Sequence, residues 1–212
     1  ANKSLKDLKK IIYQRSACLK NNDLSQIAYW DKKLIEVEPI ITNSNKDLIS
    51  SINEMLQTSD IKDHFTKKNS WLSDLRLKYT TGFDSGTIFS DILHNNIEKD
   101  RILKRTTAGP HKRSFNLYLN DTPAEDLLSR GQQKIVSIIL HLVQREIIRN
   151  KTNLSPILLM DDISSELDKD NANLMLKYLI NNNIQTVMSS IEKKRFLGKE
   201  DVFMFHVEQK GD

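Results

Sequence analysis

Apolar residues at the start of the chain recur at the spacing of a helix. Leu5, Leu8, Ile12 and Leu19 follow one another at steps of three, four and seven residues, so they line one side of a helix. The polar run of residues 21–23 then interrupts this pattern. Because a second helical pattern follows almost at once, we predict two antiparallel helices joined by a tight turn.

The second helix is predicted to be long and to carry a heptad seam. Asp23 is expected to cap it, with Gln26 completing a capping box. Its apolar positions alternate three- and four-residue steps and are Ile27, Trp30, Leu34, Val37, Ile41, Leu48 and Met55. Pro39 lies inside this helix and lacks a backbone donor, so we expect a kink or a break there. Such a seam most often only packs helices together, so it does not indicate a function.

Two more elements precede a predicted domain boundary. Residues 71–79 end in alternating apolar and basic side chains, which predicts a half-buried strand. Residues 88–105 again have helical spacing, with cations near the end, where they suit the helix dipole. We therefore assign residues 1–105 to an α-helical, coiled-coil-like arm.

From residue 106 onward short strands alternate with helices, which is the pattern of an α/β unit. The predicted strands are 116–119, 156–160, 184–188 and 202–207, and the predicted helices are 129–149 and 168–180. These strands are too few to close an α/β sheet well. The remainder of the sheet is expected to lie in sequence outside this chain, so residues 106–212 form part of a larger lobe.

Composition narrows the class of protein. Hydrophobic residues make up 38% and charged residues 28%, which is typical of a soluble protein with a large surface. No apolar run approaches the roughly 20 residues of a membrane span. The single cysteine, Cys18, excludes an internal disulfide, and no spacing suits a zinc site. A reducing cytoplasmic location fits best, and the absence of an initiating Met suggests a fragment.

Charge is unevenly distributed along the chain. The formal net charge is +4, with positive residues concentrated in 3–20 and 99–113 and acidic residues between 161 and 170. This asymmetry is compatible with a polyanionic partner such as nucleic acid. The alternative is that a lysine-rich helix simply solvates its outer face.

The first chemical motif is an apolar strand, residues 157–160, that ends in Asp161 and Asp162. The carboxyl end of a buried strand faces the crevice where ligands of α/β sheets bind, and carboxylate oxygens there suit a hydrated Mg²⁺. The alternative is a strand that meets solvent and turns.

The second motif is Leu-Leu-Ser-Arg-Gly-Gln-Gln-Lys at residues 127–134, which leads into an apolar helix. Ser129 and Gln132 form the capping box of many ordinary helices. The same helix end suits phosphate oxygens, because Gly131 allows close approach and the helix dipole lies behind it.

Together the two motifs resemble those of ABC ATPases. Residues 128–132 look like that superfamily's signature, with Arg130 in place of its usual glycine, and residues 161–168 resemble its Walker B motif and D-loop. The match narrows to the RecF family through Gly109-Pro110-His111-Lys112, the extended signature up to Lys134, and the weaker run 29–35. The resemblance implies the C-terminal half of an ABC-type ATPase head.

The resemblance assigns roles to particular residues. ATP is expected between two subunits, with the signature of one subunit closing on nucleotide held by the other; the nucleotide-binding residues are then Ser129, Arg130, Gly131, Gln132, Lys134 and, across the dimer interface, Asp168. Asp161 is expected to hold Mg²⁺, and Asp162 to polarise the attacking water. An aspartate where many ABC ATPases have a glutamate suggests slow turnover. A phosphate contact by the loop at His111 is also expected.

Two departures limit what this chain does alone. No Gly-x-x-x-x-Gly-Lys-[Ser/Thr] phosphate loop occurs in it, so by itself it should neither bind ATP tightly nor hydrolyse it. The second departure is Ser190, which stands where ABC transporters carry a switch histidine and cannot take that role.

For the complete protein the resemblance implies a weak DNA-dependent ATPase that dimerises with ATP on single-stranded and linear duplex DNA. The implied partners are RecO- and RecR-like mediators, the implied role is loading a strand-exchange protein at gaps during DNA repair and replication, and a contribution to the SOS response is expected. The alternatives are a non-enzymatic architectural module and an independent DNA-binding protein.

Overall fold

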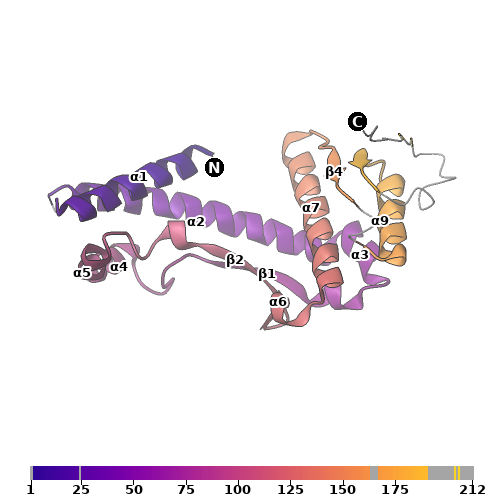
Figure 1. Ribbon diagram of the computed structural model, residues 1–212, viewed down its shortest axis with the longest axis horizontal. Coiled ribbons are helices and arrows are strands. Elements are labelled where there is room, and N and C mark those ends of the chain that lie inside the picture. The colour runs from indigo at the N-terminus through magenta and orange to yellow at the C-terminus, as the bar shows by residue number, and fades with distance from the viewer. Residues whose placement is uncertain (1, 24, 163–166, 191–202, 204, 206–212) are drawn as a thin grey trace, which may run out of the picture. The chain divides into compact units, whose positions relative to one another are not determined.

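The chain divides into two compact units. The computed structural model describes residues 2–23, 25–162, 167–190, 203 and 205 (Figure 1). Unit 1 comprises residues 1–57 and 73–127, and unit 2 comprises 58–72 and 128–212. Within the described ranges, no helix combines the length and apolarity needed to cross a bilayer.

Unit 1 is built on the predicted helical hairpin, which is confirmed. Helices α1 (Asn2–Asn21) and α2 (Ile27–Thr58) lie beside each other (Figure 1). Leu8 near the start of α1 belongs to one apolar cluster with Ile41, while Leu19 near its end clusters with Ile27. These pairings fix the antiparallel arrangement.

Helix α2 differs from its prediction in three ways. It begins at Ile27, and Asp23 accepts a hydrogen bond from the Ser25 hydroxyl, so the capping box predicted at Asp23 is wrong. The helix continues through Pro39, so of the expected kink or break the break does not occur. Beyond Ile41 the buried apolar positions are Ile49 and Leu56, while the predicted Leu48 is 39% exposed. A helix of 3.6 residues per turn drifts relative to a strict heptad, which moves the buried stripe by one residue.

A three-stranded antiparallel sheet continues unit 1. Strand β1 (Leu75–Thr80) pairs with β2 (Ser114–Leu119), and β2 turns into β3 (Thr122–Pro123). The predicted strand over 71–79 therefore starts later, because 3₁₀-helix η1 (Ser70–Asp74) precedes it. Since β2 pairs with β1, residues 106–127 belong with the arm, and the division falls after residue 127 where 105 was expected.

Side chains of α2 cover the other edge of β1. The Asn53 amide donates to the Leu77 carbonyl at 2.8 Å and accepts from the Leu77 N–H at 2.8 Å. The Gln57 amide donates to the Leu75 carbonyl at 3.2 Å. Exposed strand edges attract other strands, and these amides satisfy part of that edge within the unit.

The predicted helix over 88–105 is two helices. α4 (Phe89–Asn95) and α5 (Ile97–Leu103) are separated at Asn96, whose side chain donates to the Ile92 carbonyl and so competes with the helix backbone. The 3₁₀-helix η2 (Pro110–Lys112) and helix α6 (Ala124–Leu127) complete the unit.

A buried charge ties α1, α2 and α5 together. Arg15 is fully buried, and its guanidinium lies 2.5 Å from Asp31 and 2.5 Å from Asp100. It also donates to the Thr106 hydroxyl at 3.0 Å. Asp100 in turn accepts from the backbone and hydroxyl of Thr107. One side chain of α1 therefore holds the loop that follows α5.

Unit 2 has the predicted α/β character. It contains α3 (Asp60–Thr66), α7 (Arg130–Thr152), β4 (Leu158–Met160), α9 (Lys169–Asn181) and β5 (Thr186–Met188) (Figure 1). Strands β4 and β5 are parallel, and α3 packs against α7 and α9. The predicted helices and these two strands are confirmed, but the strand that ends at Met160 is not buried as expected, since Leu159 is 79% exposed. Residues 163–166 and most of the predicted strand at 202–207 lie outside the described residues.

We expect Arg15→Met to lower the free energy of unfolding of unit 1 by about 3–5 kcal/mol, because it leaves the buried Asp100 carboxylate without its cation. Arg101→Met removes the exposed pair with Glu98 and should cost at most about 1 kcal/mol. Urea unfolding followed by Trp30 fluorescence, in a Trp71→Phe background, measures both. Equal losses in the two variants would contradict the structural role of Arg15.

Candidate nucleotide-binding site

The N-terminus of α7 carries the predicted capping box, which is confirmed. The Ser129 hydroxyl accepts from the Gln132 N–H at 3.3 Å, and the Gln132 side-chain oxygen accepts from the Ser129 N–H at 2.9 Å. A hydroxyl both accepts and donates. The capping bond uses Ser129 only as an acceptor, so its O–H remains available to a ligand oxygen.

Gly131 leaves open space at the same helix end. A Cβ atom at this position would have no atom within 4 Å, apart from its two chain neighbours and the backbone of its own helix. Packing therefore does not require a glycine here, although glycine is a poor helix former. The neighbouring Ser129 and Arg130 are exposed and Lys134 is half-buried. A phosphate or another chain can thus approach the backbone of this turn closely.

The two carboxylates after β4 meet a serine that follows β5. The Ser189 hydroxyl donates to Asp161 at 2.5 Å and accepts from the Asp162 N–H at 2.8 Å. The Ser189 N–H donates to the Met160 carbonyl at 3.0 Å. The sequence pattern had not singled out Ser189. Its signal was its place directly after a strand parallel to β4, because the carboxyl ends of neighbouring parallel strands lie at the same edge.

Asp162 adopts an uncommon backbone conformation. Its φ is 41°, in the left-handed region that aspartate tolerates better than most residues. The bond from Ser189 to its N–H supports this conformation. The catalytic role expected for Asp162 stays a prediction.

The described residues supply few metal ligands. Across those ranges, no group of three or more His, Cys, Asp or Glu side chains is arranged to hold a metal ion. Asp161 offers one exposed carboxylate. Mg²⁺ commonly uses one or two carboxylates together with water and phosphate oxygens, so the donor set fits Mg²⁺ only in company with a bound phosphate.

Asp168 caps α9. One of its carboxylate oxygens accepts from the N–H groups of Asp170 and Asn171 at 3.0 and 2.9 Å, and the other accepts from the Asn171 side chain at 2.6 Å. The Asn171 N–H is the main cause that lowers the pKa of Asp168. Lys68 lies 3.5 Å from Asp168 and 2.8 Å from Asp170. Asp168 therefore has a structural role besides the interface contact expected of it.

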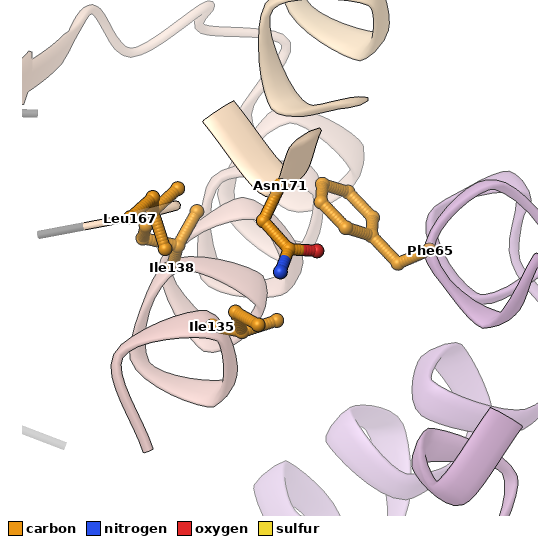
Figure 2. Close-up of a pocket in the computed structure, with 5 residues that line it drawn as sticks. All are labelled: Phe65, Ile135, Ile138, Leu167 and Asn171. Atoms are coloured by element: carbon orange, nitrogen blue, oxygen red, sulfur yellow. The ribbon is translucent and has the colours of Figure 1, made fainter. Parts of the chain in front are cut away.

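Asn171 anchors this cap in an apolar crevice. Figure 2 shows its amide between Phe65 on one side and Ile138 and Leu167 on the other, with Ile135 close by. The crevice leaves no room for a water molecule. The Asn171 amide oxygen accepts from buried Asn69 at 3.0 Å. The crevice therefore holds a satisfied polar contact, and it has no space for a small-molecule ligand.

Comparison with known proteins places these motifs in a family, although no family model matches the chain. The chain is 33% identical over 207 residues to the DNA replication and repair protein RecF of Shewanella halifaxensis. This match covers 96% of the chain and 55% of that protein. RecF of Shewanella amazonensis is 33% identical over 204 residues, with 94% and 55% covered. The chain corresponds to the C-terminal part of a RecF-family protein.

Solved RecF structures agree with the fold. A structure described as the recombination mediator protein RecF-ATP in the RecFOR pathway gives a TM-score of 0.70 at 21% identity, covering 96% of this chain and 55% of that one. Its counterpart with an ATP analogue gives 0.69, covering 91% and 54%. The fold is thus that of a partial ABC-type ATPase head lobe with a helical arm, and the chain spans about half the length of the RecF relatives it matches.

One stretch that pointed to RecF also makes a contact within unit 1. The His111 ring lies 3.1 Å from the Thr106 carbonyl, and burial lowers the pKa of His111. The phosphate contact expected of this loop stays a prediction. In the same stretch Lys112 is exposed.

We expect Asp168→Ala to lower the free energy of unfolding of unit 2 by about 1 kcal/mol at neutral pH, through loss of the helix cap. Since folding lowers the pKa of Asp168, this stabilisation is present above the ordinary aspartate pKa of about 4 and is lost as the pH falls through the lowered value. Urea unfolding followed by Trp71 fluorescence, in a Trp30→Phe background, measures it.

Asp168→Asn is the matched control, because asparagine also caps helices but carries no charge. A difference between wild type and Asp168→Ala that stays constant from neutral to acid pH would contradict the ionic contribution.

Proposed function

We propose that this chain supplies the signature and Walker B elements of a RecF-like DNA repair and replication protein that binds ATP as a dimer. The observation that carries this proposal is that unit 2 contains both motifs, the two aspartates after a strand and the capped helix end. Asp161 and Asp162 follow a parallel strand directly, and the capped N-terminus of α7 exposes the backbone at Gly131. The RecF-ATP structure among the matches supports nucleotide as the ligand.

The N-terminus of α7 would bind the γ-phosphate of a nucleotide held by a second subunit. The Ser129 hydroxyl can donate to a phosphate oxygen, and the open space at Gly131 lets that oxygen reach the helix backbone. Arg130 and Lys134 add positive charge to the same turn. Gln132 contributes indirectly, because its capping bond fixes the Ser129 backbone.

Asp161 would hold Mg²⁺ through water, and Ser189 would fix the orientation of that carboxylate. When bound, Mg²⁺ neutralises phosphate charge. Asp162 would polarise the attacking water, with its backbone held by the same hydroxyl. Its carboxylate reaches less far than a glutamate, which supports slow hydrolysis.

The exposed face of the β4–β5 pair supports a larger head. Leu159 and Val187 are paired in register and are 79% and 60% exposed. Parallel sheets are normally covered on both faces. We infer that the part of a RecF-like protein beyond this match covers these residues and supplies the phosphate loop, so that this chain alone is inactive.

The proposed role of the whole protein is DNA-dependent. It would dimerise with ATP on duplex and single-stranded DNA near gaps in the cytoplasm, and it would act with RecO- and RecR-like mediators to load a strand-exchange protein and support the SOS response. The RecFOR pathway named for the matching structure supports these partners. The rival function is an architectural module that assembles in the same way without hydrolysing ATP.

We expect Gly131→Leu, made in the full-length protein, to weaken ATP-dependent dimerisation by about tenfold or more, because the side chain fills the space left for the facing subunit's nucleotide. The stability of unit 2 should change by less than about 1 kcal/mol, since the site is open and leucine favours helix. Analytical ultracentrifugation with and without ATP measures dimerisation.

Ser137→Leu places the same side chain at an exposed position further along α7 and serves as the control. Equal dimerisation by Gly131→Leu and wild type would overturn the role of this helix end.

We expect Asp162→Asn to reduce DNA-stimulated ATP hydrolysis by roughly a hundredfold or more while ATP-dependent dimerisation persists, because the amide cannot act as a base. Steady-state phosphate release measures the rate, and Asp170→Asn controls for the loss of an exposed carboxylate in the same unit. If the wild-type protein dimerises but releases no phosphate, the architectural module is the correct function.

A further inference from the structure

Helix α1 carries an exposed basic stripe along its outer face. The stripe comprises Lys3, Lys6, Lys9, Lys10, Tyr13 and Lys20, all exposed. Lys6, Lys10, Tyr13 and Lys20 recur at helical spacing, with Lys3 and Lys9 beside them. From Lys3 to Lys20 the stripe extends about 26 Å along the helix axis. Asp7 is the one acidic residue of this helix.

Part of the stripe opposes the stability of its own helix. Lys6 has like-charged neighbours three and four residues along, at Lys9 and Lys10, which is a destabilising spacing. Helix stability therefore does not explain this cluster of lysines.

The charges of the stripe are not neutralised within the described ranges, where no carboxylate lies within ion-pair distance of its lysines. Some exposed cations elsewhere have such partners, for example Lys33 with Glu36 and Lys78 with Asp121, whereas Lys32 and Lys46 of α2 have none among the described residues. On α1, Arg15 is paired, and it lies on the buried face.

The composition of the stripe favours a polyanion over a protein. Tyr13, at 73% exposed, is its one large exposed apolar side chain. Protein interfaces have an apolar centre, which this face lacks. Lysine ammonium groups and a tyrosine hydroxyl are suitable donors to phosphate oxygens, and a regular row of them matches the regular charge of a nucleic-acid backbone.

We propose that the α1 stripe binds the sugar-phosphate backbone of duplex DNA. The inference rests on the proposed DNA-dependent function and deepens it by assigning the contact to one helix face of unit 1. Because the stripe offers lysines and a tyrosine and no bidentate base-reading pair, binding through it is independent of base sequence.

The test compares two charge-matched double variants of the full-length protein for binding to a labelled linear duplex over a series of salt concentrations. Lys6→Gln/Lys10→Gln removes two charges from the stripe, and Lys32→Gln/Lys46→Gln removes two exposed charges from α2. The plot of log affinity against log salt has a negative slope. We expect the stripe variant to make this slope less steep by about 1.8, at roughly 0.9 per lost phosphate contact. The α2 variant should leave the slope unchanged.

Lys6→Arg/Lys10→Arg keeps the charge and should restore the wild-type slope, and circular dichroism checks that each variant is folded. Equal slopes in the two glutamine variants would overturn the stripe as a DNA contact while leaving the proposed function intact. A stripe variant that keeps its DNA affinity but no longer binds an acidic protein partner would also overturn it. No DNA binding by the wild-type protein would overturn the proposed function itself.

Discussion

The parallel pairing of β4 with β5 determines which side chains meet at the candidate site. Because parallel strands end at the same edge, the residues that follow them become neighbours although they are far apart in sequence. Asp161 and Asp162 follow one strand and Ser189 follows the other. A single hydroxyl then donates to one aspartate and accepts from the backbone of the next. The orientation of both acidic residues thus depends on strand pairing.

Helix capping serves both structure and chemistry in unit 2. Ser129 and Asp168 each cap a helix, so the presence of either residue is explained without any ligand. What separates the two is the surrounding space. At α7 the glycine that follows meets no neighbouring atom, whereas at α9 the cap is anchored by Asn171 in a crevice too narrow for water (Figure 2). The α7 end is therefore the one at which we propose phosphate binding.

Sequence patterns predicted the elements better than their boundaries. Periodicity found the hairpin and the two long helices of unit 2, because each buries a regular stripe. Strands β4 and β5 were found as short apolar runs, although Leu159 and Val187 at their centres are exposed. Periodicity misplaced the buried positions after Ile41, since a heptad count cannot register helical drift. It could not find Ser189 or the pair Asn69 and Asn171, because these contacts join segments distant in sequence. The pairing of β1 with β2 was missed for the same reason, and with it the division of the chain.

The two faces of α1 show how burial decides what a charge does. Arg15 is surrounded by protein, and leaving it unpaired would be costly, so Asp31 and Asp100 are held against it and the helix is fixed in place. The lysines on the outer face are hydrated. Because water solvates their charges, they need no ion-pair partner and the fold does not depend on them. The stability of unit 1 therefore depends on the first face and little on the second. Fold stability does not account for the exposed lysines, and a polyanion is the partner we propose for them, because the face is basic and has little apolar surface.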